Sequence, residues 1–138
     1  MIKTRKVLLL VSAVLLLAGC ATGPEPPAPE QTLEERAQAR WEALIARDYG
    51  EAYQYQSPGF RRSNPMDAFA RDQGRRPFNF LFAEVQGSEC ERDDRCTVTV
   101  RVRYQPTSGP AELRRMRPYR NLQETWLRID DQWWFVQN

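Results

Sequence analysis

The 138-residue sequence contains no histidine, and its lysines stand only at positions 3 and 6. Without an imidazole, histidine-based acid–base catalysis is excluded and few residue combinations remain for a zinc site. Cysteine is scarce as well, with three residues and no C-x-x-C pair. The apolar run Val7 to Ala18 is shorter than the roughly 20 residues that cross a bilayer as a helix. We therefore expect neither a metal nor a cofactor.

The first 20 residues have the arrangement of a secretory signal peptide. Lys3, Arg5 and Lys6 precede the apolar run, and Leu17-Ala18-Gly19-Cys20 closes it. This closing motif resembles the lipobox of bacterial lipoproteins at all four positions. The resemblance implies cleavage before Cys20, a diacylglycerol on its sulfur and an acyl chain on its new amino group. The alternative is an ordinary signal peptide that happens to contain Gly-Cys.

The expected anchor also predicts a location. A single acyl chain binds a membrane only marginally, whereas two or more chains hold a protein there stably. In lipoproteins of this kind an aspartate after the lipidated cysteine favours the inner membrane, and here Ala21 follows Cys20. We expect an outer-membrane lipoprotein whose domain faces the periplasm.

Three segments are expected along the chain: a signal peptide at 1–19, the lipidated cysteine with a tether at 20–31, and one domain at 32–138. Residues 21–30 include four prolines and reach roughly 30 Å as an extended chain. Cleavage after residue 19 removes both lysines and one arginine, which leaves 17 arginines against 18 acidic residues, a net charge of −1. Such a domain lacks the basic footprint of a nucleic-acid-binding protein.

Cys90 and Cys96 remain once Cys20 carries lipid, and the oxidising periplasm favours a disulfide between them. The five intervening residues, 91–95, are all charged and predict an exposed hairpin tip. A disulfide that closes a loop this small stabilises the folded state by roughly 2 kcal/mol. The alternative is a redox-active or metal-binding pair, against which the C-x5-C spacing and the acidic tip both argue.

Helical periodicity dominates the first part of the domain. Thr32 and Glu35 form a capping box ahead of an amphipathic helix of about four turns. Its apolar face is assigned to Leu33, Ala37, Trp41, Leu44, Ile45 and Tyr49, and its polar face to residues that include Arg36, Arg40 and Arg47. A break at 47–50, a short helix at 51–56 and a turn at 57–59 follow. Pro65 begins a last short helix, with Met66, Phe69 and Ala70 inward and Gly74 at its end.

From Pro77 the period changes to the alternation of strands. Phe78, Phe80 and Phe82 are predicted to share one face of a strand that leads to the Cys90 hairpin. In the next strand Val98, Val100, Val102 and Tyr104 share one face, and Arg101 and Arg103 lie on the other. A basic loop at 106–118, a strand at about 119–129, a turn at Asp130-Asp131 and a strand at 133–136 complete the chain.

This order of elements predicts an α+β fold in which helices pack on one face of a curved, four-stranded antiparallel sheet. Four stretches resemble the NTF2-like, or cystatin-like, superfamily: the helix at 36–45, residues 52–61, the strands bridged by the disulfide, and the closing hairpin at 124–136. The chain looks closest to small envelope lipoproteins of Gram-negative bacteria. The resemblance implies a cone-shaped pocket between helices and sheet. Enzymes of this fold place Asp, His or Tyr there, and no such residue is transferred to this chain.

Six residues are candidates for a pocket or a partner-binding surface: Tyr53, Tyr55, Arg101, Arg103, Trp126 and Trp134. The aromatic members are equally typical of core packing between helices and sheet. If the concave face carries Arg101 and Arg103, they need acidic partners or an anionic ligand, whereas on a solvent face they do little. Arginines at 61–62, 75–76 and 114–117 either hold an anionic partner or lie in solvated loops.

Two functions are consistent with these features. The preferred one is a non-enzymatic envelope lipoprotein that binds another envelope component, or a second copy of itself, through its sheet. The alternative is a periplasmic domain or enzyme that takes a small ligand in the cavity. A closed, aromatic-filled cone favours the first, and an open pocket with converging arginine, tyrosine and aspartate groups favours the second.

Overall fold

A computed structural model describes residues 31–137. The predicted signal peptide, the lipobox with Cys20 and most of the tether therefore lie outside the described residues. Within 31–137, no helix has the length and apolarity needed to cross a bilayer.

Four helices precede the sheet: α1 (Leu33–Ala46), α2 (Tyr49–Gln54), α3 (Pro58–Ser63) and α4 (Met66–Gly74). The predicted capping box is confirmed, because the Glu35 amide donates to the Thr32 hydroxyl and the Thr32 amide donates to the Glu35 carboxylate. Arg47 then adopts a left-handed conformation (φ 59°) that ends α1 and turns the chain into α2.

Two local predictions between 57 and 66 are wrong. Ser57 does not start a simple turn; its hydroxyl accepts from the Phe60 amide and caps α3. Pro65 occupies the cap position of α4 rather than its first turn, with no side-chain cap. On α4 only Phe69 is deeply buried, and Met66 is 48% exposed because the first turn of this helix projects from the molecule.

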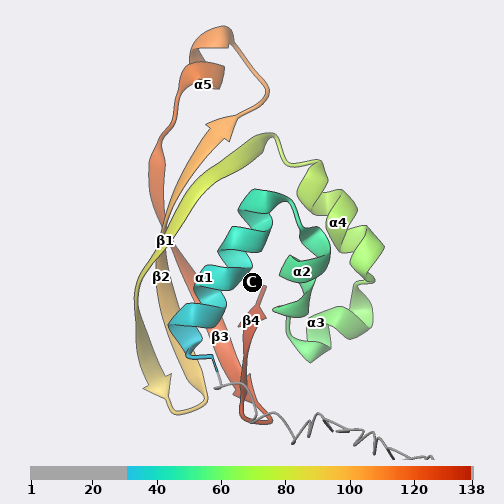
Figure 1. Ribbon diagram of the computed structural model, residues 1–138, viewed down its shortest axis with the longest axis vertical. Helices are drawn as coiled ribbons and strands as arrows, with labels where there is room; N and C mark the ends of the chain where they lie inside the picture. The colour runs from blue at the N-terminus through green and yellow to red at the C-terminus, as the bar shows by residue number, and fades with distance from the viewer. Residues whose placement is uncertain (1–30, 138) are drawn as a thin grey trace, which may run out of the picture.

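The sheet is an antiparallel meander of β1 (Phe78–Arg92), β2 (Arg95–Pro106), β3 (Tyr119–Ile129) and β4 (Gln132–Val136) in the order β1-β2-β3-β4. The predicted basic loop contains a short helix, α5 (Ala111–Arg115), at the far end of β2 and β3 (Figure 1). The disulfide joins Cys90 and Cys96, which are register partners across the β1–β2 hairpin. Asp130 and Asp131 make the predicted turn with φ of 51° and 59°.

A β-bulge corrects the predicted faces of β1. The register skips between Phe80 and Phe82, so the strand turns over within the phenylalanine run. Ala83, 6% exposed, faces the core, and Phe82, 38% exposed, lies on the opposite face. The prediction that Phe78, Phe80 and Phe82 share one face is therefore wrong for Phe82, which follows the bulge.

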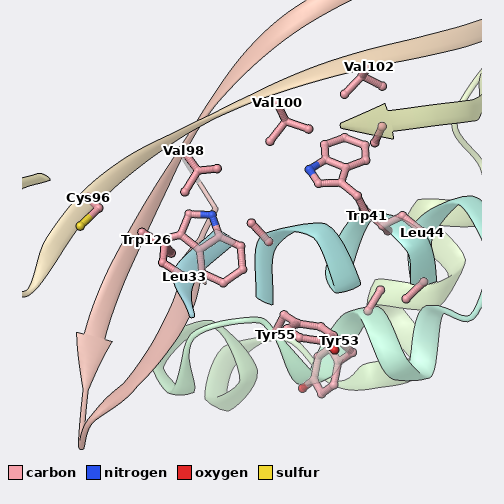
Figure 2. Close-up of a cluster of buried hydrophobic side chains, with 14 of the residues drawn as sticks. Leu33, Trp41, Leu44, Tyr53, Tyr55, Cys96, Val98, Val100, Val102 and Trp126 are labelled. Carbon is pink, nitrogen blue, oxygen red and sulfur yellow. The ribbon is translucent and has the colours of Figure 1, made fainter. Parts of the chain in front are cut away.

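Helix α1 lies between the sheet and α2 (Figures 1 and 2). The sheet face that it covers, here called the inner face, carries the predicted valines Val98, Val100 and Val102, all buried. Trp41 of α1 lies beneath Val100 and Val102 (Figure 2) and meets Phe80 edge-on at 4.9 Å between ring centroids. The opposite, outer face carries no helix of this layer (Figure 1).

Candidate functional site

A cavity of 590 Å³, open to solvent, separates α1 and the end of α4 from the inner face of β2, β3 and β4. Its apolar wall consists of Phe78, Phe80, Val102, Leu122 and Phe135. Its ionisable lining consists of Arg40, Arg76, Arg120, Glu124 and Tyr104. The volume falls within the range of about 300–1,000 Å³ that is typical of small-molecule sites.

A buried ion pair forms the floor of this cavity. Arg40 on α1 donates to the Glu124 carboxylate on β3 at 2.8 Å, and both side chains are buried. The other Glu124 oxygen accepts from the indole N–H of Trp126 at 3.2 Å. The Arg40 guanidinium carbon lies 3.6 Å from the centroid of the Phe135 ring, which adds a cation–π contact. Glu124 is thus held by two donors.

Burial lowers the pKa of Arg40. Removing the guanidinium from water disfavours its charged form, and the nearby Arg76 acts in the same direction. The negative charge of Glu124 opposes both effects by favouring the charged form. The floor therefore keeps its arginine charged through the ion pair.

Two donors on the floor have no partner among residues 31–137. They are the Arg40 Nε and the Trp41 Nε1, which are buried on residues that line the cavity. Native proteins pair almost all such groups, and an unpaired buried donor costs about 1–3 kcal/mol. Both atoms have almost no accessible surface, so they are covered by other protein atoms rather than exposed in the cavity.

Arg76 and Arg120 line the cavity with exposed side chains and form its rim. Neither takes part in an ion pair with a residue in the described part of the chain. Partial desolvation lowers the pKa of Arg76, while Tyr49 and Asp72 oppose the shift from longer range. Three arginines against one glutamate leave the cavity with two net positive charges.

The predicted tyrosines Tyr53 and Tyr55 do not line this cavity. Both lie on the side of α1 that faces away from the β2 valines (Figure 2). The Tyr53 hydroxyl donates to the Asn64 carbonyl at 2.7 Å, and the Tyr55 hydroxyl donates to Glu51 at 3.0 Å. Tyr53 thus joins α2 to the end of α3, and Tyr55 bonds back to α2 itself.

The two predicted tryptophans lie on opposite faces of the β3–β4 hairpin. Trp126 is fully buried and supports the floor through its hydrogen bond to Glu124. Trp134 lies outside the cavity, where the guanidinium groups of Arg36 and Arg61 contact its ring at 5.6 and 4.8 Å. Its indole N–H donates to the Ile129 carbonyl within the β3–β4 hairpin.

Arg101 and Arg103 lie on the outer face, so the structure contradicts the prediction that they could line the cavity. Arg101 lies 4.4 Å from the centroid of Tyr119, and Arg103 lies 5.5 Å from the same ring. Arg103 also contacts Phe82, which the β1 bulge has turned to this face. These four side chains are here called the outer cluster.

The floor residues carry a signal in the sequence that the face assignment missed. Arg40 follows Leu33 and Ala37 and precedes Leu44 at spacings of three and four, so it lies on the buried stripe of α1. Glu124 shares strand parity with Leu122 and Trp126. A positive and a negative residue, each on an apolar face, indicate a buried pair. The sequence around the rim residues Arg76 and Arg120 gives no such indication that they line a cavity.

The described residues contain no cluster of three or more His, Cys, Asp or Glu side chains that could hold a metal ion. The ionisable groups that converge on the cavity are instead arginines, with Glu124 already bonded. The arrangement suits the binding of an anion or of a polar group that accepts hydrogen bonds.

Comparison with solved structures places this arrangement in a known fold. The chain resembles a SEC-C motif containing protein from Rhodopseudomonas palustris, with TM-score 0.58, 20% identity, and coverage of 77% of this chain and 76% of that one. A SEC-C motif containing protein from Psychrobacter arcticus gives TM-score 0.60 and 11% identity over 78% of this chain and 59% of that one. A putative NTF2-like transpeptidase from Campylobacter jejuni gives TM-score 0.51 and 12% identity over 78% of this chain and 100% of that one.

No protein-family profile and no curated protein sequence matches the chain. At these identities the structural likeness defines the fold alone. The predicted fold class is confirmed: the chain has an α+β, NTF2-like fold in which helices precede a four-stranded antiparallel sheet.

Proposed function

We propose that this protein is a non-enzymatic, lipid-anchored periplasmic domain that binds a small ligand in its cavity. The observation that carries the proposal is the open, 590 Å³ cavity with an apolar wall, a buried ion pair on its floor and two arginines at its rim. A cavity of this kind is the usual form of a small-molecule site. Of the two functions expected from the sequence, the geometry favours the ligand-binding one.

The state of Glu124 supports binding without catalysis. Glu124 is the carboxylate among the described residues that line the cavity, and its oxygens accept from Arg40 and Trp126. If Glu124 took a proton from a substrate, it would lose its charge and leave the buried Arg40 without a counter-ion. Glu124 serves instead to hold Arg40 in place and to balance its charge.

The anchor belongs to the same proposal and is supported by the sequence of residues 1–20. A lipid on Cys20 and the proline-rich tether would hold the domain at the periplasmic side of the outer membrane. The ligand would then be a component of the periplasm or of the envelope.

Binding in the cavity can be tested with the purified full chain and the neutral probe p-methoxyphenylbutanol. In proton–nitrogen correlation spectra we expect shifts centred on Trp41, Tyr104 and Leu122. Leu122→Trp should abolish them by filling the cavity, whereas Leu81→Trp, at an exposed position, should not. Shifts scattered over the surface, or unaffected by Leu122→Trp, would contradict the proposal.

A second candidate function is the docking of an acidic envelope protein on the outer cluster. The observation that favours it is that Arg101 and Arg103 form no ion pair with the described residues, although both lie on a face without a helix cover. Their contacts to Tyr119 and Phe82 hold them in place. An acidic surface would supply the missing counter-charges.

Photo-crosslinking in the native envelope tests this second candidate. A photoreactive amino acid at position 119 should capture one specific partner, and the same group at the exposed Met66 position should not. Arg101→Gln with Arg103→Gln should abolish the product. A crosslinked dimer of this chain would show that the outer cluster binds a second copy instead of an acidic protein. The same products from positions 119 and 66 would contradict specific docking at the outer cluster.

A further inference from the structure

We infer that the ligand of the cavity is an amphipathic acid whose single anionic group is held by Arg76 and Arg120 at the rim. This inference rests on the proposed function, because it names the chemical class of the molecule that the cavity takes.

The charges of the lining residues favour an anion. Arg40 is neutralised by Glu124, so the two net positive charges belong to Arg76 and Arg120. Both guanidinium groups have donors free of carboxylate partners within residues 31–137. An arginine fork matches the geometry of a carboxylate or phosphate, and such charge-assisted bonds are stronger than neutral ones.

The depth of the groups orients the ligand. Arg76 and Arg120 are exposed at the rim, whereas Arg40 and Glu124 are buried on the floor. The anionic group therefore binds at the rim, because the Glu124 carboxylate would repel it from the floor. The body of the ligand then lies against the apolar wall.

The wall has aromatic and aliphatic components that suit an apolar body. Phe78 and Phe80 contact each other at 5.2 Å between ring centroids, and the Arg76 guanidinium lies 6.0 Å from each ring. Leu122 and Phe135 complete the wall toward the floor. Because this surface is continuous from rim to floor, it accepts an apolar chain or ring between the two polar ends.

Calorimetric titration of the full chain with a matched pair of probes tests this assignment. The acid is p-methoxyphenylbutyrate, and the neutral analogue p-methoxyphenylbutanol differs from it only in the head group. We expect the acid to bind at least about tenfold more tightly, with an advantage that falls as salt is added. The indole N–H resonance of Trp41 should shift with either probe, since Trp41 lines the cavity.

Neutral variants identify the groups that are responsible. Arg76→Gln and Arg120→Gln should each reduce the preference for the acid over the alcohol, and the double variant should abolish that preference. Arg75→Gln is the matched control, because Arg75 neighbours Arg76 but does not line the cavity. Circular dichroism should show the same fold for all variants, since the three side chains are exposed.

The possible results separate this inference from the proposed function. Equal binding of acid and alcohol would overturn the anionic class and leave the ligand-binding cavity standing. A preference for the acid that survives the double variant would overturn the assignment to Arg76 and Arg120. Binding of neither probe would contradict both proposals.

Discussion

At the scale of single residues, the buried pair of Arg40 and Glu124 is the feature on which the site depends. Taking two charges out of water is costly, and their attraction compensates only while both are present. The ring of Phe135 and the indole of Trp126 complete the surroundings of the pair. The exposed pair Asp67–Arg71 has a similar distance, 2.7 Å, in a quite different environment.

Replacing Glu124 by Leu should destabilise the fold by about 3–5 kcal/mol, because it leaves Arg40 charged and buried without a counter-ion. Urea unfolding of both proteins measures the difference. The double variant Arg40→Met with Glu124→Leu should recover much of the loss, since it removes both charges. Asp67→Asn should produce no measurable change, because water screens that pair. A similar effect of Asp67→Asn and Glu124→Leu would contradict this account.

Tyr55 predicts how stability depends on alkaline pH. Burial, together with the hydrogen bond to Glu51, raises the pKa of Tyr55 above its ordinary value of 10.0. A raised pKa in the folded state stabilises the fold below about pH 10, and this contribution is lost as the pH rises through the folded-state value. Tyr55→Phe should therefore weaken the decline of unfolding free energy above pH 10.

Urea unfolding at a series of pH values between neutral and strongly alkaline measures this effect. Tyr119→Phe is a suitable control, because Tyr119 is 48% exposed on the outer face. That variant should keep the pH dependence of the wild type. The same steep alkaline decline in Tyr55→Phe would show that another group causes it.

At the scale of elements, α1 is the helix that holds the two layers together. It packs on the inner face of the sheet through Trp41 and on α2 through its opposite side (Figure 2). Gln38 also reaches the free edge of β1, where its side-chain amide donates to the Ala83 carbonyl and accepts from the Val85 amide. An otherwise open strand edge is thus partly satisfied, which discourages edge-to-edge pairing.

Trp41→Ala should destabilise the protein by about 3–5 kcal/mol, because it removes a buried ring from between α1 and the sheet and enlarges the cavity. Denaturant melts measure the change. Reducing the Cys90–Cys96 disulfide should cost less, about 2 kcal/mol, and should leave the fold intact, since the bridge closes only a short hairpin. A near-neutral Trp41→Ala would show that this contact does not hold α1 to the sheet.

At the scale of the whole molecule, both edges of the sheet are engaged. The β1 edge meets Gln38, and the β4 edge pairs with the chain after α2, where the Phe135 amide donates to the Tyr55 carbonyl and the Ser57 amide donates to the Phe135 carbonyl. The faces of the sheet differ: the inner one encloses the cavity, and the outer one is open to solvent.

The proposed membrane anchor belongs to the whole chain. If Cys20 is acylated as proposed, wild-type protein should incorporate radiolabelled palmitate and sediment with the outer membrane, because more than one lipid chain would hold it there. Cys20→Ala should incorporate no label and should leave the membrane fraction. Equal labelling of the two proteins would contradict lipidation at this position.

Much of the fold could be predicted from the sequence because it depends on short-range chemistry. Thr32 and Glu35 satisfy the first amides of α1 through contacts three residues apart. The alternation from Val98 to Tyr104 fixes which residues of β2 share a face, and Asp130-Asp131 tolerates the positive φ of a tight turn. The disulfide partners could be named because the expected lipidation of Cys20 leaves only Cys90 and Cys96.

The site could not be predicted in the same way, because a period of two separates the faces of a strand without saying which face is covered. Packing of α1 decides that Arg101 and Arg103 face outward and that Glu124 faces inward. The bulge in β1 then moves Phe82 to the outer face. Sequence alone thus determined α1, α2, α4 and the four strands in their order, though not the short helices α3 and α5. The tertiary structure decided which charges meet in the cavity, since these meetings depend on contacts between residues far apart in the chain.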